Sequence, residues 1–205
     1  MQTEIYPNSI LEFWPEIDEE VDIEEISPTL LRVLWVNQKV VVTIDIFDKT
    51  AQPEFNDREI IENEIIEGKI QFTEYVIPRM MLPDSKLNEK DTSIRDKVWG
   101  YLEEAVTGKH AFDILKKRLR GIIIDEISEK YKVSKTLVRI NLRKYWQRGM
   151  RVNSLLPDLA YNQLIPDPIL EEFTPKNRLE VEEILNCFRE LAKYKGDMLS
   201  SARKY

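Results

Sequence analysis

Hydrophobic and polar positions follow two different patterns along this chain, and the change falls near residue 80. Before it, "TLLRVLWV" (Thr29–Val36) and "KVVVTIDIF" (Lys39–Phe47) are rich in β-branched and aromatic residues and flank the dipeptide Asn37-Gln38. Runs of this composition predict β-strands, and the short polar pair between them predicts a tight hairpin. Alternating apolar and polar residues predict another strand over Lys69–Ile77. These elements predict a small β-rich domain over residues 1–78.

One helix is predicted inside this β-rich domain, in the stretch "NDREIIENEIIEG" after Pro53. Asn56 can cap it, and Glu59, three residues later, is a capping-box partner. Gly68 suits the left-handed position at its end. The spacing places four isoleucines on one face: Ile60, Ile61, Ile65 and Ile66.

The pattern becomes helical after residues 79–91, a polar stretch with Pro83 that predicts a linker. "TSIRDKVWGYLEEAV" (Thr92–Val106) has apolar residues at helical spacing, with Thr92 or Ser93 as cap and Gly108 as its end. A second helix is predicted over "AFDILKKRLR" (residues 111–120). The sequence therefore predicts an α+β fold, in which the β-rich domain precedes a helical domain over residues 92–153.

The helical domain contains the layout of a helix-turn-helix, in "IIIDEISEKYKVSKTLVRINLRKYWQRG". "KVS" is predicted to form the turn, and the Ser134 hydroxyl can accept hydrogen bonds from the first backbone N–H groups of the next helix. Trp146 is expected to anchor the end of that helix and not to stack on bases. The residues expected to face inward are Ile123, Ile127 and Tyr131 in the first helix, Val133 in the turn, and Val138, Leu142 and Tyr145 in the second helix.

Charge changes this picture, because the cations gather in the helical domain. The chain has a net charge of -7, yet residues 109–151 hold 13 Lys or Arg against 4 Asp or Glu, and the remainder carries a net charge of -16. A basic block of this kind is an electrostatic footprint for a polyanion. In a recognition helix, N-terminal residues meet base edges and flanking cations meet phosphates. The DNA-binding candidates in this block are Lys116, Lys117, Arg120, Lys135, Thr136, Arg139, Asn141, Arg143, Lys144, Arg148 and Arg151.

We expect the cations between Lys135 and Arg151 to form one contiguous ridge that fits a groove of the duplex. The alternative is a basic three-helix bundle whose cations are only solvated, because surface lysines at helical spacing are common. A cap, a turn and a basic helix in this order favour the DNA-binding interpretation.

The segment from Val133 to Leu159 resembles TnsB-type transposases, relatives of Mu transposase and retroviral integrases. In that family a recognition helix runs into "RRYWQRG" and then "N-A-L-hydrophobic-P-D". Met150, Arg151, Val152 and Ser154 depart from the pattern conservatively or at variable places. The matching residues are Arg143, Lys144, Tyr145, Trp146, Gln147, Arg148, Gly149, Asn153, Leu155, Leu156, Pro157 and Asp158.

The resemblance implies a function: sequence-specific binding of double-stranded DNA at repeated sites in transposon ends, in cut-and-paste or replicative transposition. It also implies an RNase H-like core with a Mg-dependent DDE site further downstream in the parent transposase. We expect this chain to be the end-binding N-terminal portion and no enzyme itself, and we nominate no catalytic residue, metal ligand or cofactor in it. Further copies of the protein and other transposition proteins are the implied partners.

Beyond the helix-turn-helix, four prolines between Pro157 and Pro175 predict an extended connector over residues 154–174. The resemblance implies that such connectors lie along DNA, with Arg148, Arg151 and Asn153 following the backbone or minor groove. Leu155 and Leu156 can equally fold back onto the helical bundle. Residues 175–205 are predicted to begin a second helical DNA-binding module.

Single residues exclude several other functions. Cys187 is the only cysteine and His110 the only histidine, so disulfide frameworks, Cys/His zinc sites and Ser-His-Asp triads cannot be assembled from this chain alone. Cys187 is expected on a helix face and His110 in a loop or at a helix start. No apolar run is long enough for a membrane span, and no signal peptide is recognisable. We expect a bacterial cytoplasmic protein that is nucleoid-associated when bound to DNA.

Two other functions stay open at this point. A helix-turn-helix is also typical of a stand-alone transcription regulator, which the reading frame beyond Tyr205 would distinguish. The acidic run "EIDEEVDIEEI" (Glu16–Ile26) is more typical of a solvated loop or edge, but it could instead make the β-rich domain an interaction module for a basic partner, such as another transposition protein.

Overall fold

The computed structural model describes residues 4–14 and 28–158. Within this part the fold is α+β, as predicted, with an antiparallel sheet followed by helices. The acidic run, the connector beyond residue 158, the module at 175–205 and Cys187 lie outside the described residues.

The sheet of the described region has five strands in the order β4-β3-β2-β1-β5, and every neighbouring pair is antiparallel. The predicted hairpin is confirmed, because the Asn37 side chain accepts hydrogen bonds from the backbone N–H groups of Lys39 and Val40, both at 2.9 Å. Neither β1 nor β4 was predicted from the sequence pattern. The strands are β1 (Ile10–Phe13), β2 (Thr29–Val36), β3 (Val40–Asp45), β4 (Glu54–Asp57) and β5 (Ile70–Thr73).

Both faces of the sheet are covered. On one face Val33 and Val41 pack into a cluster with Ile61 of α1 (Arg58–Ile66). On the other face Leu34 and Val42 pack into a cluster with residues of the later helices. A register shift between Val33 and Trp35 lets Leu34 and Trp35, although adjacent, pack against this same cluster.

α1 is the helix predicted after Pro53, with two corrections. Its cap is Asp57, whose side chain accepts from the Glu59 backbone N–H at 2.8 Å, and Asn56 belongs to β4 instead. Its four isoleucines do not share a buried face, because Ile61 is buried whereas Ile66 is 81% exposed. Gly68 follows the helix with a positive φ of 77°, as predicted.

Three α-helices follow the sheet: α2 (Glu89–Val106), α3 (Lys117–Tyr131) and α4 (Lys135–Gln147). α2 begins earlier than predicted because the Asn88 side chain caps it, accepting from the Lys90 backbone N–H at 2.8 Å. The predicted helix over residues 111–120 is wrong. The 3₁₀ turn Asp113–Leu115 occupies its first part, shortly after another 3₁₀ turn at Gly108–His110, and its end belongs to α3.

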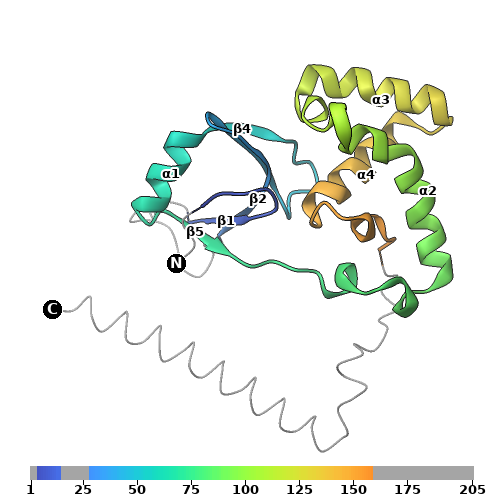
Figure 1. Cartoon of the computed structure of the whole chain (residues 1–205), viewed down its shortest axis with the longest axis horizontal. Helices are drawn as coiled ribbons and strands as arrows, with labels where there is room; N and C mark the ends of the chain where they lie inside the picture. The colour runs from blue at the N-terminus through green and yellow to red at the C-terminus, as the bar shows by residue number, and fades with distance from the viewer. Residues whose placement is uncertain (1–3, 15–27, 159–205) are drawn as a thin grey trace, which may run out of the picture. The chain divides into compact units, whose positions relative to one another are not determined.

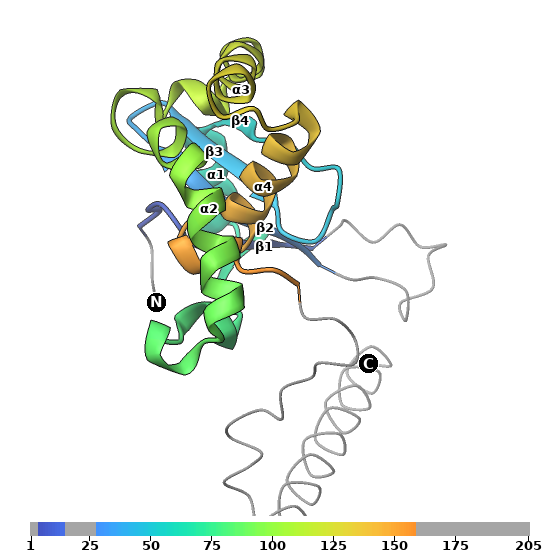
Figure 2. The ribbon, with the colours of Figure 1, turned by 90° about the vertical axis from the view of Figure 1, so that its right-hand side faces the viewer.

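The sheet and the helices share one apolar core. Leu34, Val42 and Ile44 of the sheet join Leu102 of α2 and Leu142 of α4 in a single buried cluster. Figure 1 shows α1 on one side of the sheet and α2, α3 and α4 on the other, and the turned view places α2 and α4 in front of the strands (Figure 2). The described residues up to Pro157 form one compact unit.

The predicted linker is part of this unit. It holds the 3₁₀ turns Pro78–Met81 and Asp84–Lys86 and the first residues of α2. Arg79 donates to the Asp91 carboxylate at 2.5 Å and to the Pro157 carbonyl at 2.7 Å, so the start of the segment is joined to its own end and to the chain that follows α4.

Candidate nucleic-acid interface

The first half of α4 is a capped helix start with its polar residues in solvent. The Ser134 hydroxyl accepts a hydrogen bond from the Leu137 backbone N–H at 3.2 Å, which confirms the predicted cap. Lys132, at the end of α3, adopts the left-handed conformation with φ 55°, so three residues, 132–134, make the turn. Thr136 and Arg139 are exposed, and neither has a hydrogen-bond or ion-pair partner among the described residues.

Lys135 is exposed but not isolated, because its ammonium lies 2.9 Å from the Asp125 carboxylate of α3. Both side chains are about half exposed, so the pair is open to solvent and screened by salt. Two exposed residues, Arg118 and Ile122, precede Asp125 on α3 at helical spacing and thus on the same stripe. The site prediction did not include Arg118; its signal was the uninterrupted run of cations at residues 116–118.

The second half of α4 faces the rest of the fold. Val138, Leu142 and Tyr145 are buried, as predicted, and Trp146 is also buried, which confirms its role as an anchor. The prediction that Asn141 faces outward is wrong. It is 7% exposed, and its side-chain amide donates to the Tyr101 hydroxyl of α2 at 2.6 Å.

The loop between β3 and β4 covers the outer side of this second half. The Arg143 guanidinium donates to the carbonyls of Ala51, at 3.2 Å, and of Lys49. Gln147 donates from its amide to the carbonyls of Asp45 and Asp48, both at 2.7 Å. Because these side chains donate to backbone carbonyls of the β3–β4 segment, Arg143 joins α4 to the sheet and is not free to contact DNA in this arrangement.

Arg32, in the middle of β2, joins the sheet to the end of α4. It is 3% exposed, and its guanidinium donates to Asn8 Oδ1 at 2.6 Å, to the Gln147 carbonyl at 3.3 Å and to the Tyr75 carbonyl at 3.4 Å. Burial lowers the pKa of Arg32 to about 10, so the group stays charged at neutral pH. No carboxylate in the described region pairs with it, and the carbonyl dipoles satisfy its donors instead.

The exit from α4 requires a glycine. Gly149 has φ 114°, which side-chain-bearing residues rarely adopt, and its surroundings alone would not exclude a side chain, since the nearest atoms, of Arg32 and Asn8, lie 3.8 Å from the place of a Cβ. Beyond it, a 3₁₀ turn over Val152–Leu155 redirects the chain.

Asn153, which was predicted to follow DNA, has its polar atoms bonded within the fold and fixes this exit. Its Oδ1 accepts from Arg95 of α2 at 2.5 Å, and its amide donates to the carbonyls of Leu82, at 2.9 Å, and Met80, at 3.3 Å. Arg95 itself is buried, and the Asp84 and Asp96 carboxylates raise its pKa. The Arg148 guanidinium donates to the Leu156 carbonyl at 3.1 Å, so this side chain too is turned toward the fold.

Leu155 and Leu156 are buried, which confirms the alternative in which they fold back onto the bundle. Leu155 lies in the same apolar cluster as Trp146 and Tyr145. The residues that carry the family resemblance therefore serve mainly to fix the end of α4 and the following turn. They are a signature of the fold more than of base contacts.

The three candidates around the start of α3 also differ in how far they are exposed. Arg120 is buried; it donates to the Leu115 carbonyl at 2.8 Å and lies 6.0 Å from the Trp146 ring, and burial lowers its pKa. Lys116 is half-buried, 2.9 Å from the Asp113 carboxylate and over the Phe112 ring. Lys117 is exposed.

The expected contiguous ridge from Lys135 to Arg151 is therefore wrong in its second half. Buried Asn141 and loop-bound Arg143 interrupt it, and Lys144 and Arg148 are half-buried. Tyr131, expected in the core, is 38% exposed. The candidates that remain exposed are Lys117, Lys135, Thr136, Arg139 and Arg151.

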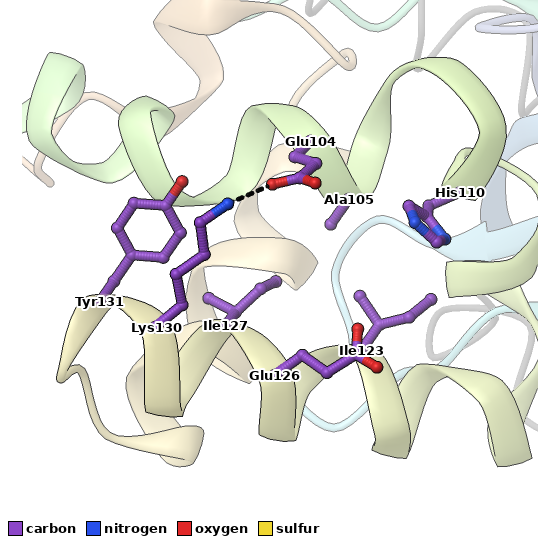
Figure 3. Close-up of a pocket in the computed structure, with 8 residues that line it drawn as sticks. All are labelled: Glu104, Ala105, His110, Ile123, Glu126, Ile127, Lys130 and Tyr131. Carbon is purple, nitrogen blue, oxygen red and sulfur yellow. Dashed lines mark hydrogen bonds and ion pairs between the residues drawn. The ribbon is translucent and has the colours of Figure 1, made fainter.

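A small open pocket of about 90 Å³ lies between α2 and α3, lined by His110, Glu104, Glu126 and Tyr131 among others (Figure 3). Lys130 spans its edge, 2.7 Å from the Glu104 carboxylate. The pocket is smaller than ordinary ligand sites. Within residues 4–14 and 28–158, no three His, Cys, Asp or Glu side chains are grouped to hold a metal ion, and no helix is both long and apolar enough to cross a membrane.

A helix-turn-helix whose second helix is capped, cation-bearing and half displayed defines this region as one of the helix-turn-helix DNA-binding class. Comparison with known proteins narrows the class. Residues 4–75 match the family described as the TnsB N-terminal SH3-like domain, and residues 95–159 match the TnsB second domain. The chain is 24% identical over 127 residues to the transposon Tn7 transposition protein TnsB of Escherichia coli.

These matches follow one another in the chain and cover both the sheet and the helices. The described region is thus the N-terminal DNA-binding region of a TnsB-type transposase. The aligned residues are 62% of this chain but only 18% of the Escherichia coli protein.

Proposed function

We propose that this region binds double-stranded DNA specifically at transposon ends, with the first turns of α4 in the major groove. The observation that carries the proposal is the division of α4. Its capped first half displays Lys135, Thr136 and Arg139, while its second half is held by the sheet and α2. A helix fixed at one end and exposed at the other can enter a groove without loss of its own packing.

The charge distribution supports a duplex as the ligand. Lys117, Arg118, Lys135, Arg139 and Arg151 are exposed on or beside the helix-turn-helix. If all five neutralise phosphates, the logarithm of affinity falls with the logarithm of salt concentration with a slope of about 4.5. Binding by hydrogen bonds and cations needs no metal or cofactor from this chain.

The wider setting belongs to the same proposal. Further copies of the protein on repeated end sites and other transposition proteins are the partners we propose. We assign no catalytic step to residues 4–158.

The test is an electrophoretic mobility shift of the full 205-residue chain on a duplex from its transposon end and on a scrambled duplex of equal composition. We expect at least about tenfold tighter binding to the end, the equivalent of one base contact. Equal affinity for the two duplexes would refute sequence-specific binding.

A charge-reversed pair of variants tests the assigned surface. Arg139→Glu places a negative charge on the displayed half of α4 and should abolish the shift. Lys97→Glu makes a comparable reversal at an exposed position of α2 and should preserve it. The opposite result would move the interface from α4 to α2.

A further inference from the structure

An isoleucine lies in the middle of the displayed half of α4. Ile140 is 42% exposed and follows Thr136 by four residues, while Arg139 follows Thr136 by three, so both side chains flank Thr136 on the same side of the helix. Val138, also a branched aliphatic residue of this helix, is fully buried. The outward position of Ile140 is therefore fixed by the packing of its neighbours.

Exposure of a single apolar side chain indicates nothing by itself, because much of any protein surface is apolar. The place of Ile140 is what matters. A duplex that meets Thr136 and Arg139 must also meet Ile140, which can neither donate nor accept a hydrogen bond. The apolar group that base pairs display in the major groove is the C5 methyl of thymine.

We propose that Ile140, together with the methyl group of Thr136, contacts the C5 methyl of a thymine, so that the bound site requires thymine opposite the middle of α4. This inference rests on the proposed function and specifies what its site recognises. Cytosine at the same place carries a hydrogen where thymine carries the C5 methyl group, so the aliphatic side chain would lose this contact. Arg139, one residue away, supplies donors for acceptor atoms of the neighbouring base.

The experiment removes the methyl group from the DNA and leaves its hydrogen-bonding groups unchanged. A footprint first locates the site of the full chain on the end duplex, and each thymine inside it is then replaced singly by deoxyuridine. Dissociation constants are measured by fluorescence anisotropy. We expect wild type to bind the duplex about fourfold more weakly when deoxyuridine replaces thymine at one or more positions, since a buried methylene contributes about 0.8 kcal/mol.

Variants connect this loss to the side chain. Ile140→Ala should bind the thymine and deoxyuridine duplexes equally at the sensitive position, and Ile140→Val should give an intermediate ratio. Ile66→Ala, which truncates an isoleucine of α1 that is even more exposed, should keep the wild-type ratio. Because Ile140 is outside the core, all three variants should retain the wild-type circular dichroism spectrum.

The possible failures are distinguishable. If wild type prefers its end duplex over a scrambled one but tolerates every deoxyuridine, or if Ile140→Ala keeps the wild-type ratio, the thymine contact is refuted and the proposed function stands. If wild type does not prefer the end duplex at all, the proposed function itself fails.

Discussion

The two halves of α4 have nearly the same density of polar residues but opposite surroundings. In the first half Thr136, Arg139 and Ile140 face solvent. In the second half Asn141 and Arg143 donate hydrogen bonds to Tyr101 and to the loop between β3 and β4. Polar residues of one helix can therefore have different roles. Some fix the position of the helix, and others remain available to a ligand.

The largest expected effect tests whether the second half supports the fold. Leu142 is 1% exposed and belongs to the shared core, so Leu142→Ala should lower the free energy of unfolding by about 2–5 kcal/mol. The matched control is Leu137→Ala on the same helix, at a side chain that is 44% exposed, with an expected change within about 0.5 kcal/mol. Urea denaturation measures both, and similar losses for the two variants would contradict the division.

The next effect tests whether the first half reads sequence. Arg139→Ala should reduce discrimination between the end and scrambled duplexes by about 1–3 kcal/mol, with unchanged stability. Lys117→Ala, at an exposed cation of α3, should weaken both duplexes alike and lower the salt slope by about 0.9. Competition binding at several salt concentrations checks both, and loss of discrimination from Lys117→Ala alone would reverse the two roles.

A smaller effect concerns the start of α4. Ser134→Ala removes the side-chain acceptor of the Leu137 N–H and should lower the free energy of unfolding by about 1 kcal/mol. Ser134→Thr keeps an acceptor and should lose less. Thermal unfolding of the two variants distinguishes them. Equal stabilities would show that the cap contributes little.

The smallest effect separates stability from binding within the first half. Asp125→Asn breaks an exposed ion pair and should change the free energy of unfolding by less than about 1 kcal/mol. It also removes the carboxylate that competes with a phosphate for Lys135, so affinity for any duplex should rise. Weaker binding would mean that Asp125 orients Lys135 in the complex.

The sequence predicted those features that depend on near neighbours. The Ser134 cap, the inward Val138, Leu142 and Tyr145, and the Asn37 hairpin all follow from spacing and side-chain chemistry within a few residues. The start of α3 could not be predicted this way. The apolar residues before it have helical spacing, yet Asp113–Leu115 forms a 3₁₀ turn and one long helix begins only after it.

The site was predictable only where no distant partner intervenes. Asn141 is hydrogen-bonded to a hydroxyl 40 residues away, and Arg143 to a carbonyl 92 residues away. The structural role of these two residues therefore could not be recognised from α4 alone. Arg32 carried a local signal, since it is the single charged residue of an otherwise apolar strand, whereas Arg95 carried none, because its helix contains many charged residues. The consecutive valines Val40, Val41 and Val42 likewise indicate a strand covered on both faces.

The cluster that unites Leu34, Val42 and Ile44 with Leu142 has a consequence for chimaeric proteins. An engineer who wants to alter the DNA sequence that is bound would exchange the sheet or the helices for those of a relative, and the two parts meet at this apolar interface, the seam between the two matched family segments. Such a hybrid has to inherit complementary apolar surfaces from both parents, or the transplanted helices will be seated differently. Retargeting by substitution within the first turns of α4 leaves this seam untouched and is the safer route.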